Sequence, residues 1–122
     1  MMAEELVRLG ANVAIHGTRQ DSPRTFGEGE SMEQVAADVA ESGPGEAMAC
    51  WCDVTIEQEV QRAANEVRDR FGQIDILVCC AGGDIGAAGT SVGKGGRPEN
   101  DDCLNISLAD YQSVMDRNLL GS

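Results

Sequence analysis

Apolar and polar positions along the chain alternate between the helical period and short runs typical of buried strands. Near the start, Met2, Leu6 and Leu9 recur at helical spacing. Gly10 follows them, where a helix would end. The next apolar run, NVAIH, is bounded by Gly17 and predicts a short buried strand.

Two further helices are indicated by capping sequences. Ser31 and Gln34 form an S-x-x-Q box that opens SMEQVAADVAES, and a Gly-Pro-Gly sequence stops that helix. The apolar run EAMACWCDV then predicts a second strand. Thr55 and Gln58 form another box, before a helix whose apolar stripe is Ile56, Val60, Ala64, Val67 and Phe71.

A third apolar run, IDILVCC, predicts a third buried strand. A long polar loop at about 83–106 follows, which we expect to be flexible. Ser107 and Asp110 then cap a last helix. Alternating strands and helices with nearly all-apolar strands predict an α/β fold, a doubly wound parallel sheet with helices on both faces.

The overall composition fits a single domain over residues 1–122. A net charge of -12 with only 9 Lys and Arg argues against nucleic-acid and anionic-membrane partners. No run approaches the ~20 apolar residues that span a bilayer. Glu4 and Glu5 stand where a secretory signal would be basic, so we expect a cytoplasmic protein.

The cysteines are expected to be free thiols that pack in the core. They are odd in number: Cys50, Cys52, Cys79, Cys80 and Cys103. An odd number in a reducing compartment disfavours a disulfide framework. The spacing also disfavours zinc, because strand neighbours such as Cys79 and Cys80 project to opposite faces and cannot chelate one ion together.

Ligands of such sheets bind outside the carboxyl ends of the strands, here HGTR, DVT and AGG. Ala81, Gly82 and Gly83 would let a ligand approach the main chain, or form a plain turn. Asp53 could accept a hydrogen bond from an exocyclic amine, or cap the following helix. Arg19 suits a phosphate monoester, or is a solvated surface residue.

Asn118 is the polar residue hardest to assign to the surface. Tyr111, Val114, Met115, Asn118 and Leu119 follow helical spacing on what we expect to be the apolar stripe. A buried amide left unpaired costs about 1 to 3 kcal/mol, so it needs a polar partner. A bond to a nearby backbone group is the alternative to a functional role.

These motifs together resemble, in order, the short-chain dehydrogenase/reductase family: LVRLGANVAIHGTR, CDVT, LVCCAGG and MDRNLLG. The resemblance implies a partial Rossmann domain over 1–122. It implies that Asn118 is a catalytic residue anchoring the water through which protons leave. It also implies the cofactor-binding residues Thr18, Arg19, Asp53, Val54, Cys80, Ala81 and Gly82.

The activity implied by the resemblance is hydride transfer between NAD(P)(H) and a carbonyl or hydroxyl substrate, such as a 3-oxoacyl thioester. Arg19 favours NADP(H) over NAD(H), because the matching family position contacts the 2'-phosphate. The intact parent is expected to be a homo-oligomer. The alternative is a non-catalytic nucleotide-binding or interaction protein, with Cys79, Cys80 or Cys103 as a redox-sensitive handle.

Part of the family's machinery has no counterpart in the sequence. By the resemblance, the glycine-rich phosphate loop would end about where Met1 stands, and the Ser and Tyr-x-x-x-Lys would come after Ser122. Tyr111 does not substitute, because Met115 lies four residues on. We therefore expect this chain alone to be inactive and at best marginally stable, with unpaired strand edges.

Overall fold

The computed structural model describes residues 2–90 and 93–121. The chain divides into two compact units, Met1–Leu77 and Val78–Ser122, and each is described by itself. None of the helices in the described ranges is long and apolar enough to cross a membrane.

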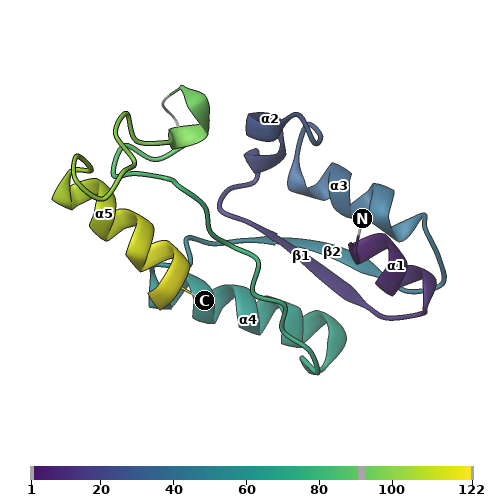
Figure 1. The fold of residues 1–122 in the computed structure, drawn as a ribbon. Coiled ribbons are helices and arrows are strands. Elements are labelled where there is room, and N and C mark those ends of the chain that lie inside the picture. Colours follow the sequence, from purple (N-terminus) through teal and green to yellow (C-terminus); the bar gives the residue numbers. More distant parts are fainter. Residues whose placement is uncertain (1, 91–92, 122) are drawn as a thin grey trace. The chain divides into compact units, whose positions relative to one another are not determined.

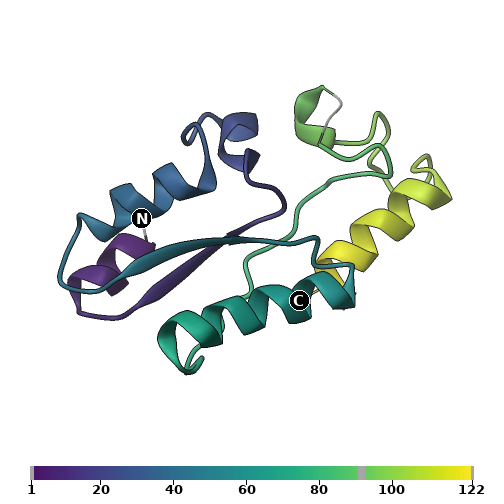
Figure 2. The same cartoon turned by 180° about the vertical axis from the view of Figure 1, so that it is seen from behind.

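The first unit is an α/β layer arrangement around a two-stranded parallel sheet. Val13 of β1 pairs with Ala47 of β2, and Gly17 pairs with Trp51. Helices α1 and α3 cover one face of the strands and α4 covers the other (Figures 1 and 2). The elements are α1 (Met2–Arg8), β1 (Val13–Gly17), α2 (Ser22–Phe26), α3 (Met32–Ala40), β2 (Ala47–Trp51) and α4 (Glu57–Phe71). The parallel sheet with helices on both faces is as predicted.

Apolar side chains of the covering helices form the core of this unit. Val7 of α1 and Val39 of α3 are fully buried, which stabilises the layers by about 1.5 to 3 kcal/mol for each side chain. Met32 and Ala36 are buried on α3, and Cys50 and Cys52 are buried in and just after β2. The prediction that thiols pack in the core is confirmed for this pair.

The Gly-Pro-Gly stop before β2 reflects close backbone packing. Gly45 N donates to Val7 O at 3.2 Å. A Cβ at Gly45 would overlap the carbonyl oxygen of Ala11, and one at Gly43 would overlap the backbone of Arg8. These glycines therefore let the α3–β2 turn lie against the end of α1.

Of the two helix caps predicted for the first unit, one is confirmed and the other is wrong. Ser31 Oγ accepts a hydrogen bond from Gln34 N at 3.2 Å and opens α3. Helix α4 instead begins after Ile56, with no side-chain cap. Thr55 does not cap it because the N-cap position is Ile56, one residue further on, and the Thr55 hydroxyl donates to the Asp53 carboxylate in the turn before the helix.

The third predicted strand is not formed. Residues 74–80 are not assigned to a strand, and their backbone makes no hydrogen bond within the part of the chain that the structure describes. Ile76 and Leu77 are 77% and 79% exposed. A parallel strand needs a neighbour to complete its ladder, and among the described residues none pairs with this segment. The expected burial of Cys79 and Cys80 is therefore wrong, since both are exposed.

Helix α2 was not predicted, although the sequence carries its signals. Pro23 lies in its first turn, where its fixed φ suits a helix. Gly27 ends it with a φ of 69°, which glycine adopts without strain. The helix is only five residues long, so it shows no hydrophobic period.

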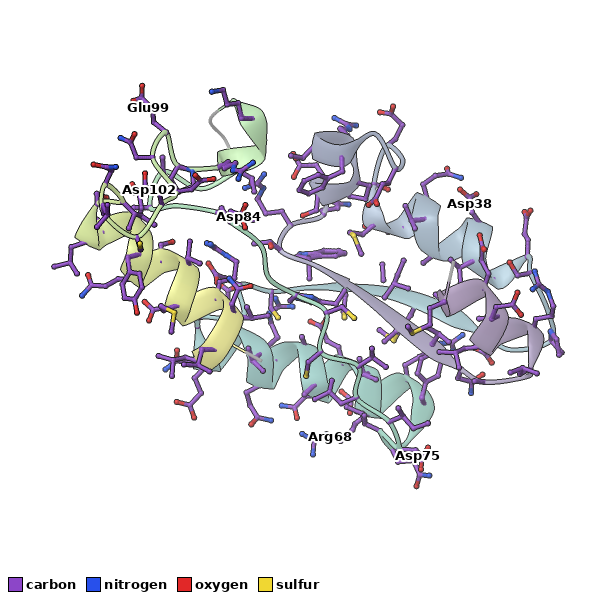
Figure 3. The ribbon with its side chains drawn as sticks, in the orientation of Figure 1. Asp38, Arg68, Asp75, Asp84, Glu99 and Asp102 are labelled. Atoms are coloured by element: carbon purple, nitrogen blue, oxygen red, sulfur yellow. The ribbon has the colours of Figure 1, made fainter. Side chains whose placement is uncertain are left out.

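The second unit consists of a long loop and a C-terminal helix. Its elements are η1 (Lys94–Gly96), α5 (Leu108–Met115) and the π-helical turn η2 (Asp116–Leu120). Ser107 Oγ accepts from Asp110 N at 3.1 Å, so the predicted cap is confirmed. Asp102, which Figure 3 labels on this loop with Asp84 and Glu99, accepts from Leu104 N at 2.9 Å. Such local bonds fix the backbone of residues 102–105.

Candidate functional site

The carboxyl ends of β1 and β2 lie side by side because the two strands are parallel and in register. Cys52 N donates to Gly17 O at 3.0 Å, one step past the last strand pair. The segments HGTR and CDVT therefore leave the sheet at the same edge, as predicted for two of the three candidate loops.

A histidine ties these two strand ends together. His16 Nε2 lies 3.1 Å from Cys52 O and 3.2 Å from Cys52 Sγ. A carbonyl oxygen can only accept, so Nε2 carries the hydrogen. Burial raises the pKa of the Cys52 thiol, which favours its protonated form. The contact is therefore a structural link between the ends of the two strands.

Asp53 follows β2 and organises the turn into α4. Its Oδ1 accepts from Thr55 N at 2.9 Å and from Thr55 Oγ1 at 2.7 Å. Asp53 N donates to Glu59 Oε2 at 2.8 Å. The turn fixes the backbone of Asp53 and Val54, both half-buried, at the sheet edge. The local role of Asp53 that the sequence left open is thus present, as a turn rather than a helix cap.

Arg19 lies in the loop after β1, next to the exposed Thr18. Arg19 N donates to Ser22 Oγ at 2.9 Å, which joins the loop to the start of α2. Its guanidinium Nε is 3.3 Å from Asp21 Oδ1, and the side chain is 49% exposed. The sheet edge thus carries a half-exposed cation that pairs with Asp21.

In the second unit, Asn118 holds the glycine turn. Its Oδ1 accepts from Gly83 N at 2.8 Å, and its Nδ2 donates to Gly83 O at 3.0 Å and to Val114 O at 2.8 Å. Gly82 leaves room for this amide, because a Cβ there would overlap Asn118 Oδ1. Gly83 has a φ of 120°, which favours glycine.

The prediction that Asn118 is buried on an apolar stripe is wrong. Asn118 is exposed, as are Tyr111 and Leu119 of the same stripe. The amide is satisfied by backbone groups, the alternative that the sequence left open. The side chain of Asn118 is therefore fixed by its hydrogen bonds to Gly83 and not by burial.

Three further polar residues of the last helix contact the start of the long loop, and sequence reasoning missed them. Asp110, Ser113 and Arg117 bond to backbone groups of Ile85 and Ala87. Their helical spacing with Asn118 is the signal in the sequence that places them on the same face of the helix.

The predicted site residues thus fall into two sets. Around the β1–β2 edge the structure brings together Thr18, Arg19, Asp53 and Val54. In the second unit Ala81 and Gly82 precede the turn held by Asn118, and Cys80 is exposed just before them. No cluster of three His, Cys, Asp or Glu side chains able to hold a metal ion occurs among residues 2–90 and 93–121.

A parallel α/β arrangement with polar turns at its strand ends defines the partial Rossmann class of fold. The sequence profile described as short chain dehydrogenase matches residues 1–122. The chain therefore belongs to the short chain dehydrogenase family, which confirms the resemblance drawn from its motifs.

Curated relatives agree with this assignment. Human 3-hydroxyacyl-CoA dehydrogenase type-2 is 33% identical over 103 residues, covering 77% of this chain and 36% of that protein. Rat hydroxysteroid dehydrogenase-like protein 2 is 39% identical over 78 residues, covering 63% of this chain and 14% of that protein. The chain thus spans about a third of the human relative and less of the rat one.

Solved structures show the same fold. An NADH-dependent reductase, A1-R', complexed with NAD superposes with a TM-score of 0.69 at 27% identity. The match covers 98% of this chain and 40% of that reductase. A second structure of A1-R', described as responsible for alginate metabolism, gives a TM-score of 0.70 at 26% identity.

Proposed function

We propose that this chain is the cofactor-binding part of an NAD(P)(H)-dependent oxidoreductase that transfers hydride between nicotinamide and a carbonyl or hydroxyl group. The observation that carries the proposal is the parallel register of β1 and β2, which puts the Arg19 and Asp53 loops at one sheet edge. Family membership and the NAD-complexed reductase support a nicotinamide cofactor.

Each residue set fits a part of the dinucleotide. The ordered turn at Asp53 and Val54 presents backbone and carboxylate acceptors to adenine. Ala81 and Gly82, with Cys80 before them, offer little side chain and so allow the ribose to approach the backbone. We assign Asn118 to hold the following turn and to anchor the water through which protons leave. When bound, the nicotinamide supplies the hydride.

The cofactor is proposed to be NADP(H) in preference to NAD(H). Arg19 presents an exposed guanidinium, with Thr18 beside it, and a guanidinium fork suits a phosphate monoester. Asp21 is its counter-charge at 3.3 Å and would be displaced by the 2'-phosphate.

Competing nucleotides test this preference on the 122-residue chain. We expect adenosine 2',5'-bisphosphate to bind more tightly than 5'-AMP in an NMR titration. The Arg19→Met variant should abolish the difference, and Arg24→Met, another exposed arginine of the same unit, should not. Equal binding of the two nucleotides would contradict the NADP(H) assignment while leaving adenosine binding intact.

The chain alone is proposed to be inactive. It has no Tyr-x-x-x-Lys sequence, and Tyr111 is followed four residues on by Met115. Tyr111 therefore lacks the lysine partner of that sequence, which assists proton transfer. Steady oxidation of NADPH by the 122-residue chain with a ketone or thioester substrate would refute this.

A 3-oxoacyl thioester is the proposed substrate class of the intact parent, which we propose to be a cytoplasmic homo-oligomer. The human relative, named for a 3-hydroxyacyl-CoA, supports the substrate class, and free thiols suit a reducing compartment. A non-catalytic nucleotide-binding role is the second candidate. It is favoured by Cys79 and Cys80 in LVCCAGG, which stand where the resemblance to the family implies two asparagines. An upstream glycine loop and a downstream Tyr-x-x-x-Lys in the encoding DNA would favour the enzyme.

A further inference from the structure

Four polar residues form one face of the last helix and its π-helical extension. They are Asp110, Ser113, Arg117 and Asn118, spaced i, i+3, i+7 and i+8. Each bonds to the backbone of the same short segment, Gly83–Ala87. We call this segment the loop stem, because the rest of the long loop continues from it.

The bonds reach both ends of the loop stem. Arg117 Nη1 donates to Ile85 O at 2.7 Å, and Ser113 Oγ donates to the same oxygen at 3.4 Å. Asp110 Oδ1 accepts from Ala87 N at 2.9 Å. Since Asn118 already holds Gly83, the helix face fixes three alternate residues of the stem.

The two charged members make the stronger contacts. Hydrogen bonds in which one partner is ionised are about twice as strong as neutral ones. Ser107 and the Ala87 amide hold the pKa of Asp110 below its usual value, so the carboxylate is ionised at neutral pH. A guanidinium stays charged throughout the physiological range.

The loop stem is also closely packed at Gly86, so its backbone has little room to move. Gly86 is buried, and its N donates to Gly96 O at 3.0 Å. A Cβ at Gly86 would overlap Asp110 Oδ1, so the absence of a side chain lets the carboxylate reach Ala87. A small shift of Asp110 would therefore move the backbone on both sides.

We propose that Asp110 and Arg117 are positioning residues, which fix the loop stem and through it the Ala81–Gly83 turn. The part that concerns the cofactor rests on the proposed function, which puts the ribose against Ala81 and Gly82. Neither residue touches the cofactor in this proposal. They act by holding the backbone that follows the contact.

Amide hydrogen exchange of the 122-residue chain tests the mechanical part. Asp110→Ala should speed exchange at Ala87, and Arg117→Met should speed it at Gly83 and Ile85, each by at least about fivefold. Arg68→Met is the matched control, because Arg68 bonds within its own helix to Ala64 O and Asn65 Oδ1. Arg68→Met should leave the exchange rates of the Gly83, Ile85 and Ala87 amides unchanged.

Conservative variants separate positioning from a general loss of folding. Arg117→Lys keeps a donor for Ile85 O and Asp110→Asn keeps an acceptor for Ala87 N, so both should restore most of the protection. The proposal would be overturned if Arg117→Met and Asp110→Ala exchanged these amides at the rate of the unsubstituted chain. It would also be overturned if Arg117→Lys and Asp110→Asn exchanged them as fast as Arg117→Met and Asp110→Ala do.

A cofactor titration tests the second part. NADPH should shift the Gly82 amide resonance of the unsubstituted chain, and Arg117→Met should weaken the apparent affinity at least about threefold. No shift in the unsubstituted chain would refute the proposed function and leave the exchange result standing. A normal shift and affinity in Arg117→Met, with exchange increased, would overturn the positioning role.

Discussion

His16 Nε2 lies 3.1 Å from the carbonyl oxygen of Cys52, so a side chain joins the ends of β1 and β2 beyond their last backbone pair. The bond fixes the two loops that leave the sheet at this edge. It comes from His16, a residue that the sequence marked only as part of a strand end.

Removing that bond should destabilise the first unit. We expect His16→Ala to lower the free energy of unfolding by about 1 kcal/mol, because Cys52 O loses its imidazole donor. Urea denaturation followed by Trp51 fluorescence measures the effect. His16→Gln can present an amide donor and should recover part of the loss. Unchanged stability in His16→Ala would show that the bond contributes nothing.

Gly45 should tolerate no side chain. A Cβ would overlap Ala11 O, so Gly45→Ala must move backbone and should cost about 1 to 3 kcal/mol. Gly93→Ala is the control, because no atom of the described residues lies within 4 Å of a Cβ there and its φ is -55°. Thermal unfolding of both variants checks this, and equal melting temperatures would contradict the close packing.

The cap of α3 should be measurable by itself. Ser31→Ala removes the acceptor for Gln34 N and should cost about 1 kcal/mol. Ser31→Asp keeps an acceptor at the start of the helix and should retain most of the stability. Urea midpoints give the comparison. A Ser31→Ala variant as stable as the unsubstituted chain would contradict the cap.

Thiol reactivity should divide the cysteines into two groups. Burial raises the pKa of Cys50 to about 11, with Cys52 and Glu66 adding to the effect, so its thiol stays protonated at neutral pH. Timed alkylation with iodoacetamide and mass spectrometry should modify Cys79, Cys80 and Cys103 first, since these are exposed. Equal rates at all five would contradict the buried pair.

The same burial predicts a loss of stability at alkaline pH. The folded-state pKa of Cys50 is raised from 9.0 to about 11, so the unfolded chain releases this proton first. The contribution to stability is therefore complete below pH 9.0 and is lost as the pH rises toward 11. Cys50→Ala should show a shallower decline over this window in urea titrations at successive pH values.

Local signals in the sequence predicted most of the elements. The first helix, both paired strands and the helices after Ser31 and Ser107 follow from periodicity and caps, since these depend on neighbouring residues. The strand predicted for residues 74–80 is absent, because a strand needs a pairing partner and no local pattern reveals one.

Part of the candidate site could also be predicted from the sequence. Parallel strand ends place Arg19 and Asp53 at one edge, so their proximity follows from topology. The Asp53–Thr55 turn, the exposure of Asn118 and the contact of Arg117 with Ile85 depend on competition between polar partners. The spacing of residues in the sequence does not tell which of several hydrogen-bond partners a polar side chain will take.

The most direct test of the central claim is an NMR titration of the 15N-labelled 122-residue chain with NADPH. We predict weak, saturable shifts of the amide resonances of Thr18, Arg19, Val54, Ala81 and Gly82. In the Asp53→Ala variant the shift of the Val54 resonance should disappear. Shifts confined to other residues, or none at millimolar NADPH, would contradict the claim that these residues bind a nicotinamide dinucleotide.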